Sequence, residues 1–336
     1  MELIGEGRLI LTEPKDELPH VAGMHADWQE SVVIYVWDAE NKCYVFFRIG
    51  HEPHQGENGM TALWANIWVP GQYYKYYDAL PLRDEDRLPN GFGGGGKGAS
   101  YTYKNGKHHW SIHDGDISAD LVMDDNHPPF DFFPAWHNLG EVASNHIEAT
   151  GKVSGKIVFK GKTYVMKNAV GHRDHSWGVR KWESMHTHRW APAIFGPDFV
   201  THAVGMIGPD RTLTQFGYVI RDGKLYVPKK TSVACLIEAD GLTNRGGVVN
   251  YSMESGEQLE VVYWNIVPSA LSFHRGYPCN DPMSVVTCGT RTGFGLMENA
   301  DNTMGGKERP DQKILISGYI DNGVFPYRYG TSRINQ

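Results

Sequence analysis

Residues Gly171–Trp182, which read GHRDHSWGVRKW, say the most about how this chain folds. In an extended strand successive side chains point to opposite faces, so Arg173, His175 and Trp177 would share one face. Asp174 would point to the other. Polar side chains are rarely buried without a cavity or partners. We therefore predict a strand with a polar, aromatic-walled cavity beside it.

The same period of two recurs along the whole chain, whereas a sustained helical stripe of apolar residues is hard to find. Residues 31–37 and 43–49 predict a hairpin, and Asp222-Gly223 predicts a tight hairpin turn. Gly155 and Lys160-Gly161-Lys162 are the predicted turns of a meander. These patterns indicate an all-β protein.

The two halves of the chain are similar in size and texture, and 336 residues are about twice the usual domain length. We predict two consecutive β-barrel or sandwich domains, residues 1–182 and 183–336.

Composition excludes several functions. The net charge is −7 and no basic block occurs, so neither a nucleic-acid partner nor an anionic membrane is expected. The longest apolar run, Val32–Trp37, is too short to span a bilayer. Four scattered cysteines and the lack of an apolar leader favour a cytoplasmic protein.

Two motifs resemble cofactor-binding or metal-binding sites, but the residues around them do not fit such sites. Residues Gly91–Gly98 fit a phosphate-binding loop only superficially, because glycine follows Lys97 and no helix is expected after it. His186 and His188 would share a strand face, but the glutamate that a cupin-type metal site needs does not follow them. We predict a flexible loop at Gly91–Gly98, no metal and no cofactor.

The strand that contains His186 and His188 also places Trp190 on their face. If this face and that of His175 line one cavity, it suits an apolar, unsaturated ligand with one polar end. Aromatic rings would stabilise a developing cation, and a histidine or carboxylic acid would move the proton. Trp64 and Trp68 also share a strand face, which predicts either sheet packing or an aromatic wall for the ligand.

The string DHSWG (residues 174–178), followed by Arg-x-Trp, resembles the signature of the AttH/CrtC-like superfamily, which includes carotenoid 1,2-hydratases. Residues 28–31 and 48–56 resemble its bacterial branch. Kievitone hydratase and lipocalin-type fungal cyclases are similar more distantly. The resemblance implies two consecutive lipocalin-like domains, the signature near their junction, and cofactor-free chemistry on hydrophobic substrates.

In the hydratases the signature histidine and tryptophan line the pocket, which implies the same for His175 and Trp177. Their proposed proton donor is the acid of a Tyr-x-Asp on a following strand. Residues 197–203 read PDFVTHA and lack it, which leaves Asp198 or His202 as replacements. Asp174 is either structural, paired with a nearby arginine, or catalytic.

We expect a cofactor-independent enzyme, a hydratase, dehydratase, isomerase or cyclase, that acts on a small hydrophobic, unsaturated substrate of isoprenoid or polyketide type. His175 would transfer the proton. The supporting catalytic and substrate-binding candidates are Asp174, Asp198, Arg173, Trp177, Arg180, His186, His188, Trp190, His202, Trp64 and Trp68. A non-catalytic carrier of an apolar ligand and a metal enzyme that uses His186 and His188 are the alternatives. A homodimer is left open.

Overall fold

The computed structural model describes residues 1–132, 142–182, 185, 187–207, 213–237, 244–267, 271–275 and 277–301. They divide into two compact units. We call residues 8–181 the N-terminal unit, and residues 1–7 with the described residues from 182 onward the C-terminal unit. The described elements are strands and two short 3-10 helices, η1 (Pro14–Glu17) and η2 (Asp84–Asp86). The all-β prediction is confirmed.

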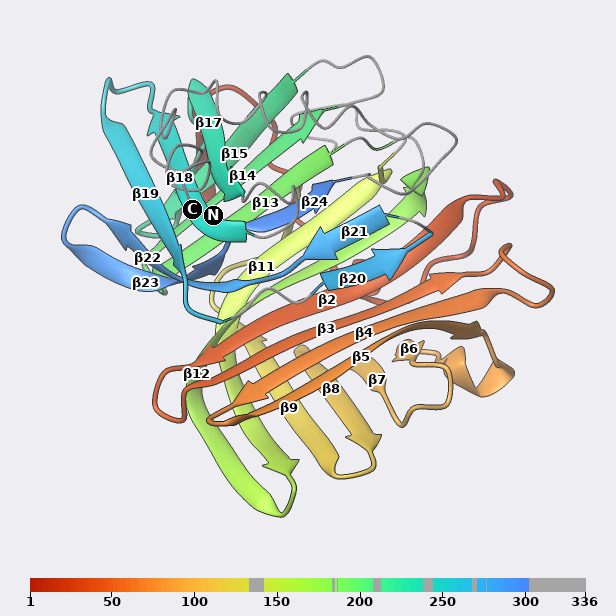
Figure 1. Cartoon of the computed structure of the whole chain (residues 1–336). Helices are drawn as coiled ribbons and strands as arrows, with labels where there is room; N and C mark the ends of the chain where they lie inside the picture. The colour runs from red at the N-terminus through yellow and green to blue at the C-terminus, as the bar shows by residue number, and fades with distance from the viewer. Residues whose placement is uncertain are drawn as a thin grey trace, which may run out of the picture. The chain divides into compact units, whose positions relative to one another are not determined.

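One antiparallel sheet makes up the N-terminal unit, in the order β5-β4-β3-β2-β12-β11-β9-β8-β7-β6, with β10 beside β11 (Figure 1). Its strands are β2 (Trp28–Asp38), β3 (Cys43–Glu52), β4 (Met60–Val69), β5 (Gln72–Pro81), β6 (Gly91–Gly93), β7 (Ser100–Lys104), β8 (Lys107–Asp114), β9 (Ile117–Asp125), β10 (Phe130–Asp131), β11 (Asn145–Phe159) and β12 (Lys162–Val179). The predicted hairpin at residues 31–49 is confirmed as β2 and β3. Gly91–Gly93, expected to be loop, pair with β7 instead.

Alternating apolar side chains build the core of this unit. Val32, Ile34 and Val36 of β2 belong to one buried cluster together with Phe47 and Trp110 from other strands. Burying each such side chain contributes about 1.5–3 kcal/mol. The core therefore fixes which face of β2 and of its neighbours points inward.

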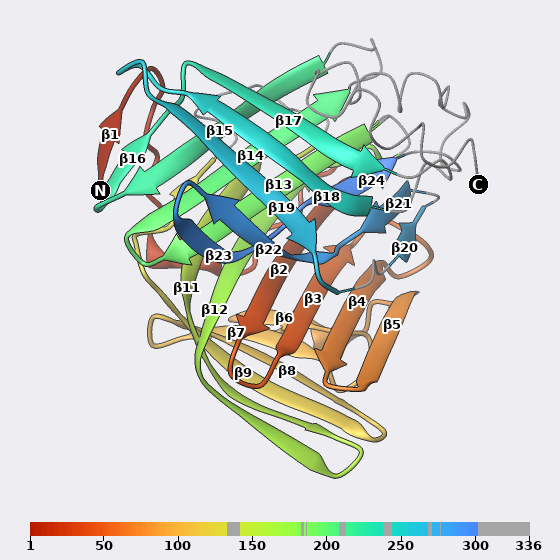
Figure 2. The same ribbon diagram turned by 60° about the vertical axis from the view of Figure 1, so that its left-hand side comes forward.

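Strands β11 and β12 form a long antiparallel hairpin (Figure 2). It differs from the sequence prediction at one glycine. Lys160-Gly161 is the predicted turn, with both residues at positive φ. Gly155 is no turn: it lies inside β11 at a β-bulge, where the register shifts between Val153 and Gly155. Its φ is +145°, and a Cβ there would lie 2.0 Å from the carbonyl oxygen of Asp120. Only glycine fits this conformation, so the residue signals a bulge.

The C-terminal unit contains the second sheet, in the order β1-β16-β15-β14-β13-β23-β22-β19-β18-β17, with β24, β21 and β20 attached. Its strands are β1 (Glu2–Ile4), β13 (Thr187–Gly196), β14 (Phe199–Ile207), β15 (Leu213–Arg221), β16 (Lys224–Tyr226), β17 (Lys230–Ile237), β18 (Asn244–Ser252), β19 (Gln258–Asn265), β20 (Leu271–His274), β21 (Tyr277–Asn280), β22 (Met283–Cys288), β23 (Arg291–Leu296) and β24 (Glu298–Asp301). The predicted Asp222-Gly223 turn joins β15 to β16, both residues having positive φ.

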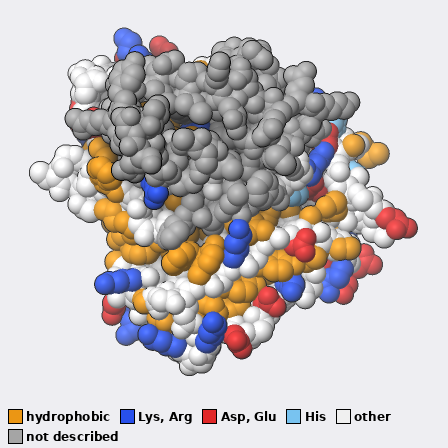
Figure 3. Space-filling view, in the orientation of Figure 1, with side chains coloured by type: hydrophobic (Ala, Val, Ile, Leu, Met, Phe, Trp, Pro, Cys, Tyr) orange, Lys and Arg blue, Asp and Glu red, His pale blue; other side chains and the backbone are white. Residues whose placement is uncertain are grey.

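The surface of the described residues is mixed. On the face in Figure 3, charged side chains of both signs lie between hydrophobic ones. A search of the described residues for a helix long and apolar enough to cross a bilayer finds none.

Candidate active site

Arg173, His175 and Trp177 lie on the face of β12 that points into the N-terminal unit. Arg173 bonds to Glu17, and the ring of His175 lies 5.7 Å from that of Phe92, which belongs to the interior cluster. Trp177 is half-buried, 5.2 Å from His175 between ring centroids. The predicted grouping of these three side chains on one face is confirmed.

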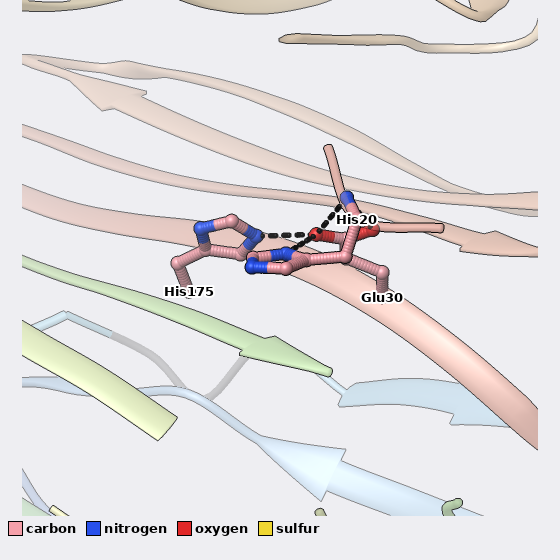
Figure 4. A group of neighbouring side chains, drawn as sticks. All are labelled: His20, Glu30 and His175. Atoms are coloured by element: carbon pink, nitrogen blue, oxygen red, sulfur yellow. Dashed lines mark hydrogen bonds and ion pairs between the residues drawn. The ribbon is translucent and has the colours of Figure 1, made fainter. Parts of the chain in front are cut away.

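His175 makes its shortest contact with a carboxylate of the neighbouring strand. Its Nε2 lies 2.8 Å from Oε1 of Glu30, and Nδ1 of His20 lies 2.7 Å from the same oxygen (Figure 4). The backbone N–H of His20 donates to both carboxylate oxygens. Since an ionised carboxylate only accepts, each imidazole presents an N–H to Glu30.

These bonds explain the protonation state of Glu30. Burial would raise its pKa, but the hydrogen bonds from His175 and His20 hold the pKa below its usual value. Glu30 is therefore ionised at neutral pH, and it fixes the orientation of both imidazoles.

The second ring nitrogen of His175 has no such partner. Nδ1 is fully buried without a hydrogen bond, and the nearest carboxylate oxygen, Oε2 of Glu17, is 4.0 Å away. Phe92 and Trp177 border the ring. A buried polar atom without a partner is rare in proteins and marks a candidate site.

Glu17 is itself held by Arg173, whose guanidinium binds both Glu17 and Asp125. Burial would raise the pKa of Glu17, but the positive charge of Arg173 lowers it. Asp125 is affected in the same way: burial would raise its pKa, but the charge of Arg173 lowers it. Next to Asp125, burial and the charge of Arg173 lower the pKa of His108. Arg173 therefore binds two protein carboxylates.

The sequence analysis missed Glu17 and His20. Both lie in residues 13–27, a segment of η1 and loop without strand alternation, and His20 stacks on Trp177 with ring centroids 3.8 Å apart. Glu30 belonged to the quoted resemblance, in the run Trp28–Ser31, but received no role. An acidic residue two positions before the apolar run that starts at Val32 was the signal available.

A pocket of about 250 Å³ opens next to this network. Glu17, His108 and Asp125 contribute to its wall, while His175 does not. Its other lining residues are Thr12, Glu13, Pro14, Tyr103, Gly106, Asp124 and Pro129. Glu17 therefore belongs both to the pocket wall and to the surroundings of His175, since its Oε2 lies 4.0 Å from Nδ1.

Asp174 lies on the opposite face of β12, as predicted. Its Oδ2 is 3.9 Å from Nε2 of His146 on β11. Arg173, one of its expected partners, points the other way, and Arg180 donates to Oγ of Ser176 and to a backbone carbonyl. The catalytic role proposed for Asp174 stays a prediction, as does substrate binding by Arg180.

The C-terminal unit holds a separate group of predicted residues. His188 bonds through Nδ1 to the hydroxyl of Tyr277 and through Nε2 to the carboxylate of Glu298. Glu298 comes from β24, 110 residues later, so an acid that does not follow His188 in the sequence reaches it from a distant strand. His186 lies outside the described residues.

Trp190 and His202 contact each other edge-to-face, with centroids 4.3 Å apart. Burial lowers the pKa of His202 far below its usual value. Asp198 lies in the turn between β13 and β14, half-exposed and paired with Arg291 at 2.9 Å. Their proposed roles in catalysis and binding stay predictions.

Trp64 and Trp68 lie on the face of β4 opposite its core residues. The guanidinium of Arg48 lies 4.4 Å from the ring centroid of Trp64, and Trp68 packs on Tyr73 at 4.6 Å. These contacts account for both rings by packing on neighbouring strands, and a role as a ligand wall stays a prediction.

The chain matches one protein family. A family model described as Domain of unknown function (DUF7064) matches residues 13–303. No curated protein sequence matches the chain.

Three solved structures are similar to the chain. A Nitrosomonas europaea protein named for AttH has a TM-score of 0.67 at 12% identity, with 88% of this chain and 97% of that one covered. CghA with Sch210972 has a TM-score of 0.61 at 13% identity, covering 87% and 98%. Kievitone hydratase from Nectria haematococca has 0.62 at 12%, covering 87% and 93%. At these identities the likeness shows the fold alone, and the predicted double lipocalin-like fold is confirmed.

Proposed function

The chain belongs to the family described as Domain of unknown function (DUF7064), and we propose that it is an enzyme that transfers a proton to or from an unsaturated hydrophobic small molecule through His175. The supporting observation is the state of that side chain. It is wholly buried, its Nε2 is bound to the Glu30 carboxylate, and its Nδ1 has no hydrogen-bond partner.

In this arrangement Glu30 positions the ring and His175 transfers the proton. Glu30 accepts from Nε2 and fixes the ring, so that Nδ1 is the atom that exchanges a proton with the substrate. Glu30 acts as a positioning residue. Glu17, 4.0 Å from Nδ1, places negative charge where an imidazolium N–H would point.

A hydration or cyclisation then proceeds in two steps. The N–H at Nδ1 protonates an sp² carbon, the π bond breaks, and a carbocation forms as the imidazole becomes neutral. Water or a substrate hydroxyl attacks the cation, and the proton that it loses returns to Nδ1. Loss of a neighbouring C–H proton instead gives an isomerised alkene. Trp177 and Phe92 border His175, and their π faces stabilise the intermediate positive charge.

The fold adds support of a general kind. Kievitone hydratase and CghA with Sch210972 have the same fold, and the first of them is named for a hydration. A hydrophobic, unsaturated substrate is the class that the aromatic surroundings of His175 fit. We include Arg180 and Trp190 among the residues to be tested for binding.

The test is deuterium incorporation. Tag-free protein is incubated in D₂O with kievitone and with farnesol, and both are analysed by mass spectrometry for added water and for carbon-bound deuterium. We expect His175→Gln to lower the rate by roughly 10²–10⁴-fold, the usual contribution of a positioned acid or base, with little change in melting temperature.

Asp174→Asn and Asp198→Asn test the two alternative carboxylic acids, and we expect both variants to retain most of the rate. Near-full activity in His175→Gln, with loss in folded Asp174→Asn, would show that a carboxylic acid does the chemistry. Binding of a probe without deuterium incorporation would favour a carrier.

A further inference from the structure

We propose that His20, Glu30 and His175 bind a divalent transition-metal ion. Each of the three offers one ligand atom, and the atoms all lie within 4.8 Å of one another. Nδ1 of His20 and Nε2 of His175 point at the same oxygen of Glu30 (Figure 4). An ion placed among them would replace two hydrogen-bonding protons.

The unpartnered nitrogen of His175 supports a ligand here independently. While the proton of a neutral His175 is on Nε2, the lone pair of Nδ1 faces the carboxylate of Glu17, 4.0 Å away. A metal on Nε2 shifts that proton to Nδ1, where it points toward Glu17. Metal-bound histidines generally direct their second N–H at a carboxylate in this way, so Glu17 takes the place of that outer partner.

Charge favours a cation as well. The network contains three carboxylates, those of Glu17, Glu30 and Asp125, and Arg173 is the cation that pairs with Glu17 and Asp125. With neutral imidazoles the network carries a surplus of negative charge, which a divalent ion would offset.

The donor set selects the kind of metal. Two imidazoles and one carboxylate suit Zn²⁺, Co²⁺ or Ni²⁺ better than Mg²⁺ or Ca²⁺, which prefer oxygen ligands. The backbone N–H of His20 donates to both oxygens of Glu30, which fixes the carboxylate beside the two imidazoles. The side chain of His20 is 25% exposed, which gives the ion a way in.

One consequence rests on the proposed function. An ion on Nε2 prevents His175 from becoming an imidazolium, because only Nδ1 then carries a proton. Zn²⁺ would therefore inhibit proton transfer by His175, and the chain would be active only without it.

The experiment uses tag-free full-length protein freed of metal with a chelator. Zn²⁺ binding is measured by calorimetry and Co²⁺ binding by visible absorption. We expect one ion per chain with a Kd below about 1 µM. His20→Ala should weaken binding by about 100-fold or more, because a ligand is lost. Glu17→Gln should weaken it by about 10–100-fold, the usual effect of removing an outer-shell partner.

His113→Ala is the matched control, since His113 is an exposed histidine of the same unit that pairs with Asp120. Its affinity should equal that of the unmodified chain. Circular dichroism and melting temperature establish that each variant is folded. His20 lies outside the strands, so its variant tests the site even where Glu30→Gln fails to fold. Failure to bind one equivalent, or equal binding by His20→Ala, overturns the proposal.

Activity separates this proposal from the proposed function. If metal-free protein incorporates deuterium and Zn²⁺ suppresses it, both stand. If metal-free protein is active and binds no ion, the metal site alone is wrong. If metal-free protein is inactive and Zn²⁺ restores activity, the metal site stands and acid–base chemistry by His175 is wrong.

Discussion

Arg173→Met should destabilise the chain strongly, because the substitution leaves the buried Glu17 and the partly buried Asp125 without their cation. The guanidinium lies 2.7 Å from Glu17 and 2.6 Å from Asp125, and Arg173 is 1% exposed. Breaking a buried pair by removing one partner costs about 3–5 kcal/mol. For a domain of this size that is a fall in melting temperature of roughly 6–20 °C.

The sign of the pH dependence identifies the cause. In the unmodified chain the pKa values of Glu17 and Asp125 are lowered, so their stabilisation is present above the unfolded pKa and is lost as pH falls through the folded one. Without the charge of Arg173, the effect of burial pushes both pKa values upward, so ionising these carboxylates costs more stability as pH rises. The deficit of Arg173→Met should therefore be larger at pH 7 than at pH 5.

Scanning calorimetry at both pH values measures the deficit. Lys107→Met is the control, because it removes the cation of an exposed pair with Asp124, and such pairs contribute about 0–1 kcal/mol. A fall of less than 2 °C for Arg173→Met at pH 7, or the same deficit at pH 5, refutes the reasoning.

Two further substitutions probe individual rings. Trp177→Phe removes part of the ring that stacks on His20, but the variant should still fold. It should bind or turn over the probes less well. A lower melting temperature with normal binding and turnover would assign the ring to the core instead. His202→Asn should flatten the acid side of the stability profile. The folded pKa of His202 is lowered by burial, so only the unfolded chain takes up its proton below about pH 6.5, which costs up to about 1.4 kcal/mol per pH unit. Urea denaturation between pH 5 and 7 measures the slope, and a slope unchanged by the substitution contradicts this origin.

The sequence predicted the strand faces and the tight turns, because both depend on residues that are neighbours in the chain. Alternation was enough to put Arg173, His175 and Trp177 on one face, because side chains of any strand alternate. Lys160-Gly161 and Asp222-Gly223 were recognisable as turns, because tight turns need residues that tolerate positive φ. Gly155 was misread because a glycine between two strand-like runs fits a bulge as well as a turn.

The partners of these residues could not be predicted, since they depend on pairings between distant parts of the chain. His175 meets Glu30 across 145 residues, and Arg173 meets Glu17 across 156. Residues 13–27 carry no periodic pattern that would place Glu17 and His20 against the sheet. The same limitation hid Glu298, which approaches His188 from 110 residues away.

The register of β2 with β12 explains why the candidate site lies where it does. On β2 the inward face is aliphatic at Val36 and Ile34, whereas on β12 it is already polar at Arg173, which pairs with Ile34. Toward the other end of this pairing the inward face becomes polar, where Trp177 pairs with Glu30 and His175 with Val32. The aliphatic end supplies burial energy without polar atoms to satisfy. The polar end holds ionisable groups whose orientation the strand pairing fixes, so substitutions near Val36 should change stability, whereas substitutions near Glu30 should change the chemistry.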